Sequence, residues 1–305
     1  MLLESVLVGA VRGGTSLVFA TLGETVSERS GVINLGTEGS MLAGALTAYA
    51  VGIETGSAWL GVAAGMVAGA ALAMVHGFLV LRRGANQIAT GLAVTFLGLG
   101  LTSLFGQSYV SQGVQGFSTH AVPGVSELPF VGPILFDHDP LTYVSFVIVP
   151  IVSFGLFRTG VGLRLRSAGE RPEVLETMGT SPERLRWLAL AVGGGLAGVG
   201  GAQLATAFAR TWSEDMVAGR GFIAVALVIF AGWSPAMTIV GAYLFSGAVA
   251  FQLELQARGT DISIFILDAI PYVIVLVVLA ALSRRRRFAM PEALESVFDV
   301  QSSAP

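Results

Sequence analysis

Residues 58–81 read AWLGVAAGMVAGAALAMVHGFLVL, an apolar stretch of 24 residues that contains no Asp, Glu, Lys or Arg. About 20 apolar residues in an α-helix cross the hydrocarbon core of a bilayer, so this stretch predicts a transmembrane helix. Gly61, Gly65 and Gly69 recur at every fourth position, a spacing at which small side chains let two membrane helices approach closely. We therefore predict an all-α membrane protein in which these glycines are packing positions.

Comparable stretches recur along the 305-residue chain, in which 53% of the residues are hydrophobic and only 12% are charged. A soluble domain usually carries about twice that charged share, whereas lipid accepts an apolar exterior. We predict a polytopic transmembrane helical bundle with about 8–9 spans, forming one domain over residues 1–305. The predicted spans cover roughly 13–30, 32–50, 58–81, 87–107, 140–158, 187–209, 219–232, 236–256 and 266–283.

The start of the chain fits two arrangements. Glu24 and Glu28 lie near the end of the first apolar segment, and Arg12 lies just before it. Either this segment is one span, or residues 1–12 form an interfacial helix and 13–28 form a short or broken span. The range of eight to nine spans reflects this alternative.

The distribution of arginine predicts the orientation, because short cytoplasmic loops collect basic residues. With the C-terminus in the cytoplasm, thirteen of the 17 arginines fall on the cytoplasmic side and three on the other side, while Arg12 belongs to neither count. Loop 109–139 contains no basic residue, so we place it outside, and we place loop 159–186 in the cytoplasm. The run Arg284–Arg287 is explained by anchoring of this topology, and binding of anionic lipid is the alternative.

The absence of two residue types excludes several kinds of chemistry. The chain has no cysteine, and all of its basic residues are arginines. Without lysine it cannot form the phosphate-binding loop of an ATPase, so any energy from ATP must come from another polypeptide. His76, His120 and His138 lie far apart and show no metal-ligand spacing. We expect no catalytic residue, no metal site and no cofactor on this chain.

The cytoplasmic loop 159–186 is predicted to contain a short helix that begins at Pro172 and ends before Gly179. Val174, Leu175 and Met178 would share one face of it, and acidic and arginine side chains flank that face. Such a helix can dock into a groove of a partner protein, and a solvated connector is the alternative. Because the chain cannot form an ATPase site of its own, we predict that this helix couples it to a separate ATPase. The predicted coupling residues are Arg171, Glu173, Leu175, Glu176, Met178 and Gly179.

A few polar side chains interrupt the predicted spans. Asn34 and Glu38 lie four residues apart, and so share a helix face. Buried polar groups in a membrane mark a substrate path, or they hydrogen-bond to neighbouring helices. The candidates for the path are Asn34, Glu38, Asn86, Gln87 and Thr90, and Gln203 is a further polar residue within an apolar span.

Several of these residues lie in motifs that resemble a known family. The motifs are SERSGVINLGTEG (27–39), ANQIATGL (85–92), GLRLR (162–166), GERPEVLETMG (169–179) and Ile270-Pro271-Tyr272 at the opening of the last span. They are similar to the nucleoside and simple-sugar branch of the branched-chain amino acid permeases of ATP-binding-cassette (ABC) importers. The chain departs from the family at Val174-Leu175, where Ala-Ala is more common, and at Thr37, where an apolar residue is common.

The resemblance implies a permease subunit in the bacterial cell (inner) membrane, which would move nucleosides or simple sugars by alternating access. It also implies as partners a homologous second permease, two ATP-binding-cassette ATPase subunits, an extracytoplasmic substrate-binding (lipo)protein and membrane lipid, and no nucleic acid.

Two other classes of protein are weighed against this one. An ion-coupled secondary transporter would act without an ATPase, but it needs buried ionisable groups, and the middle spans are almost free of acids. An intramembrane enzyme is disfavoured because no Ser/His or His/Glu pair has catalytic spacing within a span.

Overall fold

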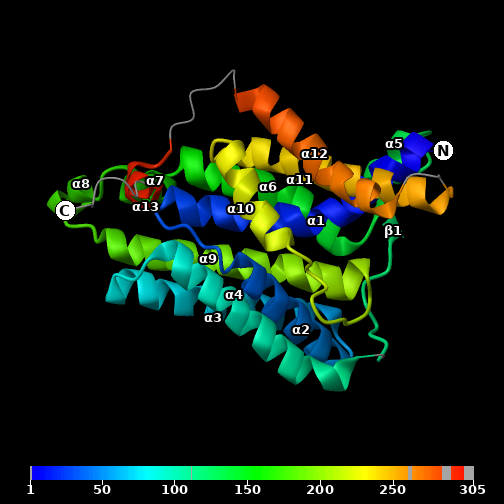
Figure 1. Ribbon diagram of the computed structural model, residues 1–305, viewed down its shortest axis with the longest axis horizontal. Helices are drawn as coiled ribbons and strands as arrows, with labels where there is room; N and C mark the ends of the chain where they lie inside the picture. Colours follow the sequence, from blue (N-terminus) through cyan, green and yellow to red (C-terminus); the bar gives the residue numbers. More distant parts are fainter. Residues whose placement is uncertain (1, 111, 260–262, 284–289, 299–305) are drawn as a thin grey trace.

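The computed structural model describes residues 2–110, 112–259, 263–283 and 290–298. Long helices lie side by side and form one elongated bundle (Figure 1). The first half contains α1 (Leu2–Arg29), α2 (Thr37–Thr55), α3 (Ala58–Gly77) with a π-helical turn (Phe78–Arg82), and α4 (Gln87–Gly106) with a 3-10 turn (Gln107–Tyr109). Next come β1 (His120–Ala121), α5 (Val131–Leu135), β2 (Asp137–His138), α6 (Pro140–Arg158), α7 (Gly160–Glu170) and α8 (Pro172–Thr177). The second half contains α9 (Pro182–Gln203) with a π-helical turn (Leu204–Phe208), α10 (Arg220–Phe230), α11 (Pro235–Ala257), α12 (Ile264–Ser283) and α13 (Glu292–Phe298).

Six helical segments of the described residues are long and apolar enough to cross a membrane, which confirms an all-α polytopic membrane protein. They are Leu2–Arg29, Ala58–Arg82, Gln87–Tyr109, Pro140–Arg158, Pro182–Phe208 and Pro235–Ala257. The total of eight or nine spans and the cytoplasmic side of the C-terminus stay predictions. The Arg284–Arg287 run lies outside the described residues.

Helix α1 decides between the two arrangements left open for the start of the chain. It is one unbroken helix of 28 residues, so an interfacial helix over 1–12 followed by a broken span is wrong. Glu24 and Glu28 do not interrupt it, because both side chains are buried by protein, at 2% and 0% exposure. Glu24 accepts hydrogen bonds from Asn34 and Thr37, and Glu28 accepts one from the Trp233 indole.

Two helices begin inside the bundle instead of at its ends. Helix α2 begins at Thr37 and not near residue 32, because residues 30–36 form an irregular segment. Helix α10 has 11 residues, a length of about 17 Å at 1.5 Å per residue, and it follows the irregular segment 209–219. It cannot cross a hydrocarbon core of about 30 Å alone, so the helical span predicted over 219–232 needs correction. Figure 1 shows both helices starting near the middle of the bundle.

The two halves of the bundle repeat one pattern in opposite directions. In each half, a long helix leads through an irregular segment to a helix that begins inside the bundle, and two further helices follow: α1 to α4, then α9 to α12. We call α2 and α10, the two helices that begin inside the bundle, the interrupted helices. Figure 1 shows α1 running towards the end that carries α8, and α9 running away from it. Helix α3 packs on α9, just as α11 packs on α1. This is the inverted-repeat arrangement found in many transporters.

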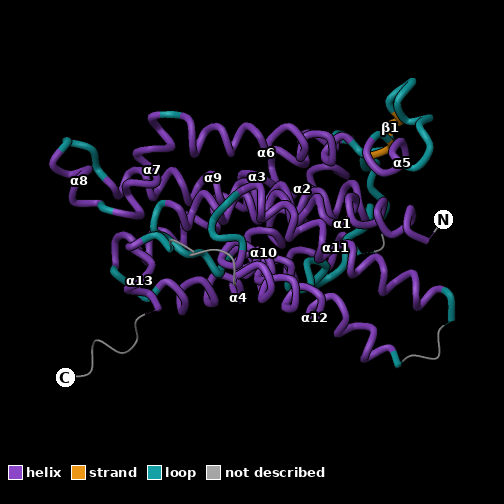
Figure 2. The backbone as a smooth tube through the Cα atoms, turned by 90° about the horizontal axis from the view of Figure 1, so that it is seen from above, coloured by secondary structure: helices purple, strands orange, loops and turns teal. Residues whose placement is uncertain are grey.

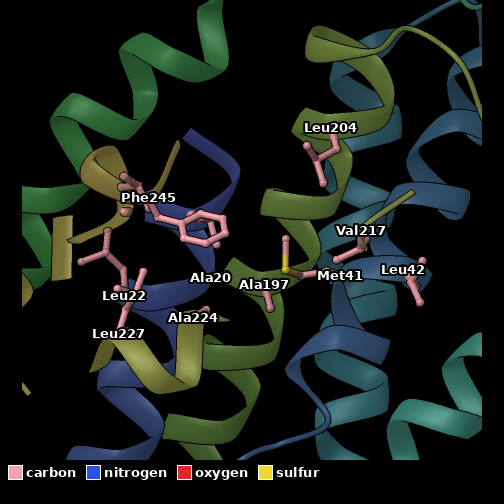
Figure 3. Packing of buried hydrophobic residues seen from close by; sticks show 13 residues of the cluster. Ala20, Leu22, Met41, Leu42, Ala197, Leu204, Val217, Ala224, Leu227 and Phe245 are labelled. Carbon is pink, nitrogen blue, oxygen red and sulfur yellow. The ribbon is translucent and has the colours of Figure 1, made fainter. Parts of the chain in front are cut away.

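The predicted glycine positions do mediate close helix packing. A Cβ atom added to Gly65 would lie 2.6 Å from the carbonyl oxygen of Gly44, and one added to Gly69 would lie 2.7 Å from the Cα atom of Gly198. The hydrophobic core lies on both sides of α9 (Figure 3). Phe245, Leu22 and Leu227 gather on one side of it, and Met41 and Leu42 on the other.

The two ends of the bundle carry different structures (Figure 2). One end, here called the β1 end, holds the start of α1, the small antiparallel pair of β1 and β2, and α5. The opposite end, the α8 end, holds α7, α8 and α13. The predicted topology requires loops 109–139 and 159–186 on opposite sides of the membrane, and they lie at opposite ends.

Two details of the helices differ from the predictions. Loop 159–186 contains a second helix, α7, and Pro271 lies inside α12 instead of opening it.

Candidate functional site

The two interrupted helices meet through one carboxylate. Glu38 lies in the first turn of α2 and is 2% exposed. Its Oε1 atom accepts a hydrogen bond from the backbone N–H of Gly219 at 2.7 Å, and its Oε2 atom accepts one from Gly221 at 2.5 Å. These N–H groups belong to the start of α10, where backbone donors lack helical partners and the helix dipole favours negative charge. Glu38, which belongs to the first repeat, therefore caps helix α10 of the second repeat.

The Gly219-Arg220-Gly221 sequence allows this contact. A Cβ atom on Gly221 would lie 2.8 Å from the Oε2 atom of Glu38 and closer still to its backbone, so only glycine leaves room for the carboxylate. Gly219 has a φ of 81°, which is in the left-handed region that favours glycine. Our sequence analysis missed this motif, although a Gly-x-Gly at a helix start is a usable signal for an anion contact.

Asn34 and its neighbours stabilise the irregular segment 30–36 from the side of α1. The Asn34 backbone N–H donates to Oε1 of Glu24 at 2.7 Å, and the Thr37 hydroxyl donates to Oε2 of the same carboxylate at 2.9 Å. The Asn34 side-chain oxygen accepts a hydrogen bond from the backbone N–H of Gly36 at 3.0 Å. Asn34 itself is 1% exposed. Buried backbone outside a regular helix needs such partners, because an unpaired buried polar group costs free energy.

Helices α3 and α4 satisfy the other side of this segment. Oε1 of Gln87 accepts a hydrogen bond from the Ile33 N–H at 2.8 Å, and His76 Nε2 lies 2.9 Å from the Ile33 carbonyl oxygen. Thr90 in turn lies 3.2 Å from Nδ1 of the same histidine. Thr95 donates its hydroxyl to the carbonyl oxygen of Leu35 at 2.9 Å. The sequence predicted Gln87 and Thr90 here, but not His76, Thr95 or Glu24.

The structure thus brings four of the five path candidates, Asn34, Glu38, Gln87 and Thr90, to the segment 30–36 and the start of α2. The fifth, Asn86, is exposed and caps α4 by accepting a hydrogen bond from Ala89. Gln203 donates to the carbonyl oxygen of Arg12 on α1 at 3.2 Å. Hydrogen bonding between neighbouring helices, one of the two roles left open, is present for most of them. Contact with substrate stays a prediction.

The segment is also attached to the helices of the α8 end. Arg186, in the second turn of α9, donates to the carbonyl oxygens of Ser30 at 3.1 Å and of Ala168 at 2.9 Å. Helix α7 also packs directly on the end of α1, because a Cβ atom on Gly169 would overlap the carbonyl oxygen of Arg29. The end of α7 is therefore in direct contact with the end of α1.

Helix α8 is the predicted short helix. It begins at Pro172, and Gly179 follows it with a φ of 71°, as a glycine at a helix end should. Leu175 is 3% exposed and packs within the chain, whereas Val174 and Met178 are 49% and 74% exposed. The predicted insertion of Leu175 into a partner therefore needs correction: the apolar surface that α8 presents consists of Val174 and Met178. The acidic and basic candidates Arg171, Glu173 and Glu176 are exposed beside it.

A cavity of about 550 Å³ lies behind α8. Its walls include Gly31 and Val32 of the irregular segment, Gln87 of α4, Glu176 of α8 and Arg186 of α9. The cavity therefore lies where the α8 end meets the irregular segment. Among the residues that the structure describes, no group of three His, Asp or Glu side chains could hold a metal ion.

The model of the family described as "Branched-chain amino acid transport system / permease component" matches residues 6–282. The chain belongs to this family. The resemblance predicted from the motifs is confirmed, and the chain is a multi-pass permease subunit of the ABC-transporter class in the cell membrane. Members of this class work with ATPase and substrate-binding partners in a transporter complex.

Curated relatives of this permease transport two kinds of substrate according to their names. It is 45% identical to the putative glucose ABC transporter permease protein TsgC13 of Haloferax volcanii, over 81% of this chain and 76% of the relative. It is 33% identical to the guanosine ABC transporter permease protein NupQ of Bacillus subtilis, over 82% and 81%. It is 31% identical to the nucleoside ABC transporter permease protein NupC of Lactococcus lactis, over 87% and 88%. No solved structure matches the chain.

Proposed function

We propose that this permease imports a simple sugar or a nucleoside, and that separate ATPase subunits drive the import by docking on α8. The names of the relatives support the substrate class. The missing lysine supports the need for a separate ATPase, since the chain cannot form a phosphate-binding loop. On this proposal the permease makes or breaks no covalent bond.

One structural observation carries the mechanism: a continuous set of contacts joins α8 to the middle of the bundle. Helix α8 follows α7 directly, and Arg186 ties the end of α7 to Ser30. The irregular segment leads from there to Glu38, which holds the start of α10. ATPase closure would move α8, and this movement would reach the point where both interrupted helices begin. Alternating access would then be a rearrangement of one repeat against the other.

The proposed assembly contains two permease subunits, this chain and a homologous one, with two ATPases and an extracytoplasmic substrate-binding (lipo)protein. We place loop 159–186 and the C-terminus in the cytoplasm, and we treat residues 1–305 as one permease domain. Asn34, Glu38, Gln87 and Thr90 lie at the junction that would move, which keeps them candidates for the substrate path. Asn86 is at the edge of this group.

An ion-coupled transporter without an ATPase is the second candidate, and one observation favours it. Glu24 and Glu28 are buried in α1, where an ion-coupled transporter needs acidic groups. However, Glu24 is bound by Asn34 and Thr37, and Glu28 accepts a hydrogen bond from the Trp233 indole. Uptake by the reconstituted complex decides between the two: ATP-dependent uptake that is lost without the ATPase supports the importer.

Substitutions at the end of α8 test the docking. Burying a Met side chain contributes roughly 1.5–3 kcal/mol, so Met178→Asp should weaken ATPase association by about 10- to 100-fold. Gly179→Val should uncouple ATP hydrolysis from uptake, because a β-branched residue is strained at a φ of 71°. Leu128→Asp, the same kind of change at an exposed apolar residue of loop 109–139, is the control. Wild-type association and uptake in both α8 variants would show that α8 is only a connector.

Labelling of single cysteines tests the orientation, since the chain has none of its own. In intact cells, a cysteine at Leu128 should react with a membrane-impermeant reagent, and a cysteine at Glu173 should be protected. The opposite result would reverse the orientation and remove the ATPase from α8.

A further inference from the structure

A second cavity, of about 350 Å³, lies between α10, α11 and α12. Its volume is within the usual range of small-molecule sites, about 300–1,000 Å³. Most of its polar groups are Arg220 from α10, Gln252 from α11 and Asp268 from α12, and the ring of Tyr272 forms part of its wall. The sequence analysis named Tyr272 as part of a family motif, but it did not single out Arg220, Gln252 or Asp268.

The charged groups in this cavity are isolated within apolar helices. Arg220 is the only charged residue of α10, and Asp268 is the only one of α12. Arg220 is half-buried and Asp268 is exposed, and charged side chains within membrane helices usually face a water-filled cavity or a partner. Within the described residues, no carboxylate lies within 4.0 Å of the Arg220 guanidinium. Oδ1 of Asp268 accepts hydrogen bonds from the side chains of Gln252 at 2.5 Å and Gln256 at 3.4 Å.

The cavity leads from the β1 end towards the helix junction. Asp268 lies in the second turn of α12, and Gln252 lies near the end of α11, and both of these helix ends belong to the β1 end (Figure 2). Arg220 lies deeper, between the two glycines whose N–H groups bind Glu38. A ligand that entered from the β1 end would therefore reach the moving part of the permease.

We propose that this cavity is the binding site of the permease for an uncharged polyhydroxylated ring, namely a hexose or the ribose of a nucleoside. The assignment rests on the proposed function and adds to it the site and the charge of the ligand. Asp268 can accept hydrogen bonds from hydroxyl groups, Arg220 can donate to hydroxyl or ring oxygens, and Gln252 can do either. Tyr272, which is 52% exposed, offers an apolar ring face for the less polar side of the sugar.

The charges of the cavity select against phosphorylated ligands. One guanidinium and one carboxylate give the lining no net charge, and a phosphate group would meet the negative Asp268. A site for anions uses several Arg or Lys side chains or backbone N–H groups instead. Glucose and uridine should therefore bind, whereas glucose 6-phosphate should not.

Protection of an introduced cysteine tests this assignment in the complete transporter. Val249 lines the cavity without being one of its polar groups, and Ile223 provides a second position should the first variant fail to fold. In outside-out membrane vesicles, a membrane-impermeant thiol reagent should modify Val249→Cys. Glucose or uridine at millimolar concentration should slow that modification severalfold, and glucose 6-phosphate should leave it unchanged. Leu128→Cys, in loop 109–139, should react at one rate throughout.

A second substitution identifies the group that binds the ligand. Asp268→Asn in the Val249→Cys background should abolish protection and lower uptake at least tenfold. Glu254→Gln should change neither, because Glu254 pairs with Arg258 on the surface of the same helix α11 and does not line the cavity.

Two results would overturn the assignment. One is no modification at either cavity position while Leu128→Cys reacts. The other is modification that glucose and uridine do not slow, in vesicles whose wild-type transporter takes them up. Wild-type vesicles that take up neither compound would instead refute the proposed substrate class, so the two failures are distinguishable.

Discussion

The two irregular segments, 30–36 in the first repeat and 209–219 in the second, differ in burial and in backbone strain. Segment 30–36 is buried, and side chains from α1, α3 and α4 bind its backbone. Segment 209–219 is largely exposed, although Trp212 and Val217 anchor it in the core. It also contains three non-glycine residues at positive φ, Arg210, Asp215 and Ala218, each of which costs about 1 kcal/mol or more. The first segment is thus over-determined by its contacts, and we expect the second to rearrange more readily.

The two segments also connect to different parts of the molecule. Segment 30–36 contacts α7, which leads to α8, the proposed docking helix for the ATPase. Segment 209–219 leads to α10 and to the cavity around Arg220. Glu38 is the contact through which the rigid half holds the other half. Substitutions in each segment and at Glu38 test whether the two segments have these separate roles.

The largest effect is expected for Glu38→Gln. The amide keeps one acceptor for Gly219 or Gly221 but turns an NH₂ group towards the other backbone N–H, and the charge at the start of α10 is lost. We expect a loss of about 3 kcal/mol at this contact, and strongly reduced uptake with normal subunit assembly. Thermal unfolding and ATP-driven uptake in proteoliposomes measure the two effects.

Glu54→Gln provides the matched control for that change. Glu54 lies at the far end of the same helix, is exposed, and accepts a hydrogen bond from the Tyr109 hydroxyl. It should change stability by less than about 1 kcal/mol. Equal effects of the two substitutions would contradict the special role of the junction.

A pair of glycines compares the two segments directly. Gly31 and Gly219 have φ values of 91° and 81°, so alanine is strained at both. A Cβ atom on Gly31 would lie 2.8 Å from Ala293 and 3.2 Å from Gly169, whereas one on Gly219 would meet nothing within 4 Å. We expect Gly31→Ala to cost about 2 kcal/mol or more, and Gly219→Ala about 1 kcal/mol.

Gly31→Ala should also reduce uptake and ATPase coupling more than Gly219→Ala does, because only Gly31 contacts α7. Unfolding midpoints of the two variants, measured side by side in one detergent, provide the test. A larger loss for Gly219→Ala would mean that segment 209–219, not 30–36, is the more tightly determined of the two.

The smallest effect is expected for Asn34→Ala. The side-chain acceptor for the Gly36 N–H is lost, but the Asn34 backbone still donates to Glu24, so the segment keeps most of its partners. We expect a loss of about 1 kcal/mol, seen as a small drop in the unfolding midpoint. If Asn34 also contacts substrate, uptake will fall by much more than this destabilisation explains. Unchanged stability and uptake would show that the other contacts suffice.

Local sequence signals predicted the features that depend on neighbouring residues. Pro172 begins α8 and Gly179 follows its end, as predicted. The fixed φ of proline and the left-handed conformation of glycine both act within a few residues. The packing role of Gly65 and Gly69 followed from their spacing alone. Long apolar runs likewise predicted the membrane helices, since the length of a span is set by the bilayer.

The errors arose where burial by distant elements reversed a local preference. Glu24 and Glu28 suggested a broken first span, but both are buried and accept hydrogen bonds from Asn34, Thr37 and Trp233. Leu175 appeared to be a docking residue, but it packs inside the chain. No local pattern shows which apolar side chain of a short amphipathic helix faces its own protein.

Composition and local motifs are enough to establish the class of this protein: an all-α membrane bundle, without lysine for an ATPase site, carrying the motifs of a permease family. The contacts that join the two repeats in the middle of the bundle become visible only in the folded chain. Glu38 and Gly219 are 181 positions apart, and they belong to two repeats that run in opposite directions. Asp268, Gln252 and Arg220 converge only because α10, α11 and α12 pack together. Contacts over such separations depend on the packing of whole helices, and no spacing along the chain encodes them.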